Sequence, residues 1–369
     1  MALSRIDTTN MIEDVPQSKI DNNINFRNII INGGMDLAQR GTSTSSITSS
    51  GYNTADRFKV TVSNMGTWTQ TQSTEVPTGQ GFAKSLKMDC TTADASPSAG
   101  DFLIIEQQVE GQNLQYLKKG TSSAESVTLS FWVKSNKTGT YIFELVDNDN
   151  SRAISKSYTI SSADTWEKKT ITYAGDTSGA FDNDNAGSLR LFFWLGGGTN
   201  YTSGTLNTSW GTRVDTNAAV GQVNLADSTS NEWYVTGVQL EAGTTASDFE
   251  FVPVDVNKNR CFRYYQVLGD SSIDNLGMAS CHSTGAAYSV IQFITEMRSA
   301  PSLDHVTGTN YYKLFNGGNT DTFDSFLFAV VSTKNGRLAN NGGISVTTGH
   351  AGWFVCENAN SFVAFDAEL

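Results

Sequence analysis

Residues 233–243 read Trp233-Tyr234-Val235-Thr236-Gly237-Val238-Gln239-Leu240-Glu241-Ala242-Gly243 and give the clearest indication of the fold. Within it, Tyr234, Thr236, Val238 and Leu240 recur at every second position. Side chains of a β-strand alternate between the two faces of a sheet, so this spacing predicts a strand with one buried face. The terminal glycine is typical of a turn.

The same alternation recurs along the chain. In residues 127–134 it separates Val, Leu, Phe and Val from Thr, Ser, Trp and Lys, and residues 141–146 and 189–195 repeat it. Clusters of Gly, Asn, Asp, Ser and Thr lie between these runs and predict turns. A helix is expected only around residues 257–267. Two sheets that each have one apolar face can pack these faces against each other and so remove them from water, which favours a β-sandwich.

Changes in pattern divide the chain into three parts. Residues 1–27 are polar and weakly periodic, and they predict an extended N-terminal arm. Residues 28–253 carry the alternating runs of a first β domain, and residues 254–369 carry further alternating strands after a polar linker. We therefore predict an all-β protein with a large sandwich, a smaller sandwich-like C-terminal module and an arm. The module ends in apolar Phe362, Val363 and Phe365, which we expect to meet a partner copy.

Composition excludes several functions. The net charge of -12 argues against a nucleic-acid partner, which needs concentrated Lys and Arg. The chain has no run of 18 apolar residues, so no membrane insertion is expected. The four cysteines show no metal-binding spacing and are expected to be buried free thiols.

Chemistry-bearing motifs are weak. The tetrapeptide Asp-Asn-Asp-Asn occurs at 147–150 and again at 182–185, and each copy is either a polar turn or a calcium loop. The EF-hand spacing fails in both copies, because no glutamate stands at the last ligand position. Cys281 and His282 are adjacent, so on a strand they point to opposite faces and form no dyad. No catalytic residue is identified, and the chain is expected not to be an enzyme.

Several segments, taken in order, resemble one family. They are residues 28–36 with Gln39-Arg40-Gly41, then 52–58, 130–134, 238–241, 263–266 and 297–301. Together they are similar to tail-fibre and other appendage proteins of phage particles, in particular those of marine short-tailed phages. Residues 11–14 and 18–21 resemble the N-terminal attachment segments of such fibres.

The resemblance implies a carbohydrate-binding jelly roll followed by a β module that trimerises. It implies a virion protein, assembled in the host cytoplasm and acting outside the cell, that adheres to glycans of the host surface. The arm would attach a homotrimer to other virion tail or head proteins. The alternatives are a capsid- or tail-associated bridging component without receptor binding and a polysaccharide depolymerase. No cofactor is required, although a structural calcium between Asp36 and Glu241 is implied by the family.

Four aromatic residues are the candidate glycan contacts. Tyr201 and Trp210 lie in the polar stretch 196–217, which has few aliphatic residues to cover their rings. Trp132 and Trp194 occupy the strand faces opposite the aliphatic side chains. Sugars bind to aromatic planes flanked by amides or carboxylates, which fits these surroundings. The alternative is that these rings pack under loops or between subunits.

Overall fold

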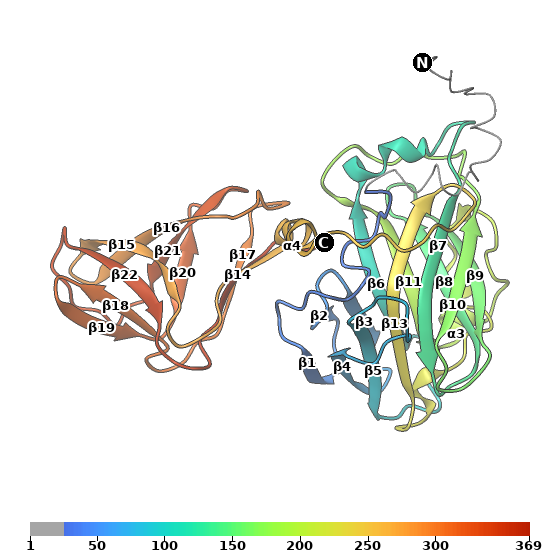
Figure 1. Cartoon of the computed structure of the whole chain (residues 1–369), viewed down its shortest axis with the longest axis horizontal. Coiled ribbons are helices and arrows are strands. Elements are labelled where there is room, and N and C mark those ends of the chain that lie inside the picture. The colour runs from blue at the N-terminus through green and yellow to red at the C-terminus, as the bar shows by residue number, and fades with distance from the viewer. Residues whose placement is uncertain (1–25) are drawn as a thin grey trace, which may run out of the picture. The chain divides into compact units, whose positions relative to one another are not determined.

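The structure is a computed structural model and describes residues 26–369 (Figure 1). The predicted arm therefore lies outside the described residues, except for Phe26 and Arg27. The chain forms two compact units, and the main division falls between Val252 and Pro253. The first unit holds residues 26–36, 42–53 and 58–252 of the described chain, and the second holds residues 37–41, 54–57 and 253–369.

The first unit is built from two antiparallel sheets. The six-stranded sheet has the order β1 (Ser43–Ile47), β4 (Thr67–Ser73), β5 (Ser85–Thr92), β13 (Glu232–Ala242), β7 (Val127–Ser135) and β10 (Glu167–Tyr173). The seven-stranded sheet has the order β12 (Gly211–Thr212), β9 (Arg152–Ile160), β8 (Gly139–Asp147), β11 (Gly187–Gly197), β6 (Phe102–Glu110), β3 (Lys59–Ser63) and β2 (Gly51–Tyr52). The chain crosses repeatedly between the sheets, and the predicted jelly-roll sandwich is confirmed.

Aromatic side chains fill the space between these two sheets. Phe131 of β7 packs edge-on against Phe193 of β11, with ring centroids 5.1 Å apart, and Phe193 also contacts Trp233 at 5.5 Å. Phe131 and Phe193 thus stand at the inward positions that the period-two pattern predicted for them.

Short helical turns join the strands of the first unit. They are η2 (Gly111–Asn113), η3 (Gln115–Leu117), α3 (Thr199–Thr202), η4 (Asp215–Asn217) and η5 (Leu225–Asp227).

The decisive strand β13 departs from simple alternation at Gly237. There the pairing register with β7 shifts, and Gly237 adopts a φ of 63°, which a glycine reaches without steric cost. Val235 pairs with Val133 before the shift and Leu240 pairs with Leu129 after it, and all four are buried. The prediction that Tyr234 and Leu240 share a face is therefore wrong, because the bulge exchanges the faces.

The second unit has its own core between two sheets and begins with α4 (Val254–Phe262), close to the helix that the sequence predicted. A three-stranded sheet has the order β14 (Tyr265–Gly269), β23 (Val363–Asp366) and β17 (Ser302–His305). A seven-stranded sheet has the order β19 (Asn319–Phe323), β18 (Tyr312–Asn316), β22 (Ala351–Cys356), β15 (Asn275–Ser283), β16 (Ala286–Gln292), β21 (Asn335–Asn340) and β20 (Phe326–Ala329).

The C-terminal strand β23 is central in its sheet and buried within its own chain. Val363 and Phe365 are buried, and Phe365 packs against Phe293 and Phe328 at about the same ring distance, 5.0 and 5.1 Å. The expectation that the C-terminal apolar residues need a partner copy is therefore wrong for Val363 and Phe365, while Phe362 is half-buried. Residues 37–41 and 54–57 also belong to this unit. Arg40 of the first segment pairs with Asp366 at 3.1 Å, and Arg57 of the other pairs with Glu368.

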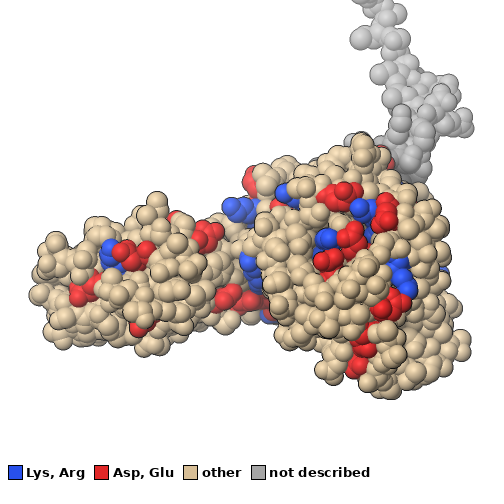
Figure 2. Space-filling model, turned by 90° about the horizontal axis from the view of Figure 1, so that it is seen from below, with Lys and Arg blue, Asp and Glu red and all other residues tan. Residues whose placement is uncertain are grey.

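All four cysteines are free and buried, as predicted. Cys281 is buried while His282 is exposed and stacks on Tyr288, so the two residues form no dyad. Within residues 26–369, no helix is long and apolar enough to cross a membrane. Charged side chains make up 17% of the sequence, and on the face drawn in Figure 2 they are sparse.

Candidate functional site

The outward face of the six-stranded sheet carries a group of rings and lysines, here called the aromatic face, made of Trp132, Trp166, Tyr234, Lys87 and Lys134. Tyr234 of β13 pairs across the sheet with Lys87 on one side and Lys134 on the other. The Lys134 Nζ atom lies 4.3 Å from the centroid of the Tyr234 ring and 5.9 Å from that of Trp166. The Trp166 and Tyr234 rings meet edge to face at 6.1 Å.

The two tryptophans are the accessible rings of this aromatic face. Trp132 and Trp166 are half-buried, whereas Tyr234 is buried between the lysine side chains. Trp132 stands two residues before Lys134 on β7 and pairs with Lys168 of β10. Because residues two apart on a strand share a face, the Trp132 side chain points outward on the same side as Lys134. A ligand on this face therefore meets two half-buried indole side chains with lysine side chains beside them.

Carboxylates frame the aromatic face. The Glu75 Oε1 atom accepts a hydrogen bond from Trp166 Nε1 at 3.3 Å and pairs with Lys134 Nζ at 3.1 Å. The hydrogen bond from Lys134 lowers the pKa of Glu75, and Glu75 remains half exposed. On the other side Glu232 pairs with Lys87 at 2.6 Å. The aromatic face thus combines apolar planes with donors and acceptors, the combination that sugar hydroxyls and C–H faces require.

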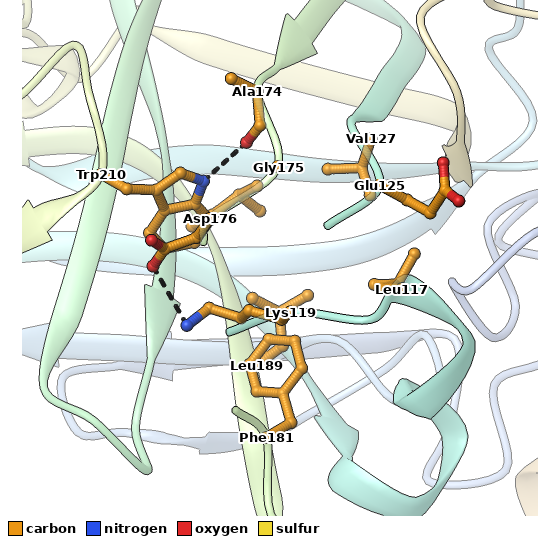
Figure 3. A pocket seen from close by; sticks show the side chains of 11 residues that line it. Leu117, Lys119, Glu125, Val127, Ala174, Gly175, Asp176, Phe181, Leu189 and Trp210 are labelled. Atoms are coloured by element: carbon orange, nitrogen blue, oxygen red, sulfur yellow. Dashed lines mark hydrogen bonds and ion pairs between the residues drawn. The ribbon is translucent and has the colours of Figure 1, made fainter. Parts of the chain in front are cut away.

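The predicted glycan residue Trp210 lies elsewhere, at a pocket on the edge of the sandwich (Figure 3). Its Nε1 atom donates to the Ala174 carbonyl at 2.8 Å. The floor is apolar, from Leu117, Val127, Leu145 and Leu189, and Phe181 forms another aromatic wall. Trp210 is half-buried, so the expectation that its ring lacks cover is only partly met.

The polar groups inside this pocket are bound to one another. Lys119 Nζ donates to Asp147 Oδ2 at 2.5 Å and to the Ser178 and Gly179 carbonyls, and it pairs with Asp176 at 3.1 Å. Burial acts to raise the pKa of Asp176, but hydrogen bonds from Arg152, Ser178 N–H and Lys119 outweigh it and lower that pKa. The Lys119 ammonium group also lies 5.4 Å from the Trp210 ring centroid. The pocket therefore leaves few polar groups for a ligand.

Trp194 is buried and offers no ring face to a ligand, whereas Tyr201 is half-buried beside it. Trp194 is 1% exposed, and its Nε1 atom donates to the buried Glu144 at 2.9 Å. Tyr201 packs against Trp194, with ring centroids 5.3 Å apart, and against Phe102 at the same distance. The expectation that the polar stretch has little to cover Tyr201 is met only in part, because Tyr201 is half-buried against Trp194 and Phe102. Trp194 packs under a loop, which is the alternative that the sequence left open.

The segment over Trp194 is fixed by backbone pairing. Ser155 N–H donates to the Asn207 carbonyl at 2.7 Å, and Ala219 N–H donates to the Tyr201 carbonyl at 2.9 Å. Ala218 and Ala219 complete the apolar layer against the outward side of β8, β9 and β11. Residues 198–219 thus cover the outward side of β8, β9 and β11 around Trp194, whereas Trp132 and Trp166 on the six-stranded sheet stay half-exposed.

The residues of the predicted calcium clamp have protein partners or lie in solvent. Glu241 accepts hydrogen bonds from Ser247 N–H at 2.9 Å and Gln239 Nε2 at 2.8 Å, and Arg27 lies 3.5 Å from its Oε2 atom. Asp36 is exposed. Glu250 accepts from the Asn28 N–H group at 2.9 Å, so side chains join the first described segment to the chain after β13. The calcium site stays a prediction that these contacts do not favour.

The repeated Asp-Asn-Asp-Asn segments form turns that touch each other. Asp149 Oδ2 accepts a hydrogen bond from Asp182 N–H at 2.9 Å, and Asn150 Nδ2 donates to the Ala180 carbonyl at 2.8 Å. Among the described residues, no group of three or more His, Cys, Asp and Glu side chains could hold a metal ion. The tetrapeptides therefore join two loops of the sandwich.

Sequence reasoning identified Trp132 but missed Trp166, Tyr234 and the two lysines. Trp166 precedes β10 in a turn and belongs to no alternating run, so no periodic signal marks it. The pairing of Lys87 and Lys134 across Tyr234 depends on the strand order β5-β13-β7, which joins residues nearly 150 positions apart.

Comparison with known proteins gives only distant similarities. No protein-family model matches the sequence, and no curated protein matches it. The chain is similar to the enzymatically active domain of tailspike protein 4 of bacteriophage CBA120, with 14% identity over 58% of this chain and 21% of that one and a TM-score of 0.31. It is also similar to TmCBM61, solved with beta-1,4-galactotriose, with 11% identity, 58% and 99% coverage and a TM-score of 0.28.

A third similar structure is the family 11 carbohydrate-binding module of a cellulosomal cellulase of Clostridium thermocellum. The identity is 13%, the match covers 57% of this chain and 95% of that one, and the TM-score is 0.26. Similarity at this level transfers no site residue to the present chain.

Proposed function

We propose that this protein is an adhesin that binds a glycan on the aromatic face of its first unit. The observation that carries the proposal is the gathering of Trp132 and Trp166 with Lys134 on one outward sheet face. Indole planes pack against the C–H face of a sugar ring, and the neighbouring ammonium and carboxylate groups satisfy its hydroxyls.

The polarity of the surroundings favours this face over the pocket at Trp210. In the pocket, Lys119 already contacts two carboxylates and two carbonyls. On the aromatic face, Glu75 is half exposed and keeps oxygen lone pairs open to solvent. A ligand rich in hydroxyl groups therefore finds more partners on the aromatic face.

The wider role follows from the resemblance of the sequence to phage appendage proteins. The protein would be a tail fibre or similar virion component, attached through residues 1–27 to tail or head proteins and presenting the aromatic face to host surface glycans. It would act without catalysis and without a required cofactor. A bridging component of the particle and a depolymerase are the competing functions, and the experiment below separates them.

The test uses the full chain on a glycan array and in adsorption to host cells. Trp166→Ala and Trp132→Ala should each weaken binding about fivefold to tenfold, since about 1–1.4 kcal/mol corresponds to that factor. Trp210→Ala is the matched control and should leave binding unchanged. Equal loss with Trp210→Ala would move the site to the pocket, and absence of any glycan binding by the wild type would favour the bridging role. Release of reducing ends from host polysaccharide would establish a depolymerase.

A further inference from the structure

The second unit leaves one sheet face without a partner inside its own chain. On the outward side of the seven-stranded sheet, Met278 pairs across the strands with Trp353, and Trp353 pairs with Phe315. Met278 is 70% exposed and Trp353 is 41% exposed. The Trp353 and Phe315 rings stack at 5.0 Å with an angle of 14° between them, so they present a flat surface.

Aliphatic side chains continue this surface across the neighbouring strands. Val290 of β16 is 65% exposed and Leu327 of β20 is 53% exposed. Ser280 of β15 pairs with Tyr288 of β16 in an antiparallel register. Met278 stands two residues before Ser280 and Val290 two residues after Tyr288, so these side chains lie opposite each other on the same face. We call Met278, Val290, Leu327, Trp353 and Phe315 the apolar sheet face.

The charges around the apolar sheet face permit like copies to approach. In the described strands of this sheet, the outward positions hold no carboxylate, although the chain has 37 Asp and Glu residues. The two basic side chains there are engaged, because the Arg337 guanidinium lies 4.4 Å from the Tyr288 ring centroid and Lys313 pairs with Glu357 at 2.6 Å. Glu357, which follows β22, is held in that pair with Lys313, so the outward strand positions of two chains that meet on this face bring no carboxylates together.

The size of the surface fits a protein partner. From their exposed fractions, Met278, Val290, Leu327 and Trp353 together expose on the order of 400 Å², which is within the range of patches that mark interaction sites. One partner of a standard interface contributes about 800 Å², and the uncharged side chains around these four can supply the remainder. Seven strands spaced about 4.8 Å apart also give a broad platform that another sheet can cover.

We propose that the apolar sheet face of the second unit is the surface on which a second copy of this chain docks. A glycan is a poorer occupant, because Met278, Val290 and Leu327 offer no hydrogen bonds to hydroxyl groups. A copy of the chain brings the same apolar surface, whose outward strand positions hold no carboxylate, so two such faces can pack against each other. This surface differs from the C-terminal strand that the sequence suggested, and it lies in a different unit from the proposed glycan site.

The test measures the mass of the full chain in solution by light scattering and sedimentation. The wild type should be a multiple of 39.9 kDa at micromolar concentration, and the double variant Met278→Glu/Val290→Glu should be monomeric. Both positions are exposed, so the thermal transition of the second unit should shift little. Ile273→Glu is the matched control, since Ile273 is 79% exposed but lies outside the strands, and it should leave the assembly intact.

Two results would overturn this proposal. One is a wild-type chain that is monomeric up to about 100 μM, and the other is a double variant that keeps the wild-type mass. The outcome is independent of the glycan proposal, because the monomeric variant should still bind glycan at each aromatic face and should lose only the gain from multivalency.

Discussion

Replacing Lys119 by methionine tests whether the charge cluster beside Trp210 stabilises the sandwich. Lys119 is buried, and its ammonium group contacts Asp147, Asp176 and two carbonyl oxygens within 3.1 Å. Asp147 is fully buried and would keep only its hydrogen bonds from Asn150, whereas Asp176 would keep two hydrogen bonds from Arg152. The variant therefore leaves one buried carboxylate without its cation.

Loss of one member of a buried ion pair costs about 3–5 kcal/mol of unfolding free energy. For a unit of this size, each kcal/mol shifts the melting temperature by about 2–4 °C, so the first unit should melt about 6–20 °C lower. Differential scanning calorimetry of the full chain measures this shift. The transition of the second unit serves as an internal reference because Lys119 belongs to the first unit.

The neighbouring Lys118→Met variant is the matched control. Lys118 also pairs with a carboxylate, Glu125, at 2.8 Å, but both side chains are exposed, and such pairs contribute about 0–1 kcal/mol. The two variants remove the same chemical group one residue apart. A Lys119→Met variant that melts within about 2 °C of Lys118→Met would contradict this prediction, since burial of the ion pair would then make no difference to stability.

Three further outcomes follow from the same contacts. Trp194→Ala should cost about 3–5 kcal/mol in chemical denaturation, because a fully buried ring leaves a cavity, and the folded fraction should still bind glycan. The pKa of Asp176 is lower in the folded than in the unfolded chain, so the stabilisation by its carboxylate is present above the unfolded pKa of about 3.9 and is lost as the pH falls. The difference in unfolding free energy between the wild type and Asp176→Asn, measured by denaturation at several pH values, should therefore shrink between about pH 5 and pH 2. Burial raises the pKa of the Cys90 thiol to about 11 and that of Cys356 to about 12, so a thiol reagent at pH 8 should label both only after denaturant is added; labelling of the folded chain would contradict their burial.

The two sheets of the first unit differ in how accessible their outward sides are to a ligand. In the first unit, residues 198–219 lie over the outward side of β8, β9 and β11, where Trp194 would otherwise be accessible. The six-stranded sheet keeps its outward side open at Trp132 and Trp166. Binding and structural roles are thus divided between the two sheets, although both carry tryptophans at outward positions.

The alternation of apolar and polar residues predicted the fold class and, in residues 127–134, the side chains that point inward. A period of two is a local property, because neighbouring side chains on a strand must point to opposite faces. For residues 127–134 this rule correctly placed Leu129, Phe131 and Val133 in the core. It also placed Trp132 outward, and it separated Cys281 from His282 correctly.

Which outward rings stay accessible depends on segments that pack over the sheets, and the alternating pattern does not show these segments. Trp132 and Trp194 have the same local pattern. Trp194 is nevertheless buried under side chains of residues 201–219, whereas Trp132 is half-buried on the same strand as Lys134. The bulge at Gly237 likewise exchanged the faces of β13, because one inserted residue reverses the alternation for the rest of a strand. Covering and strand order arise from contacts between residues far apart in the chain, and a local pattern carries no information about which distant segment will supply them.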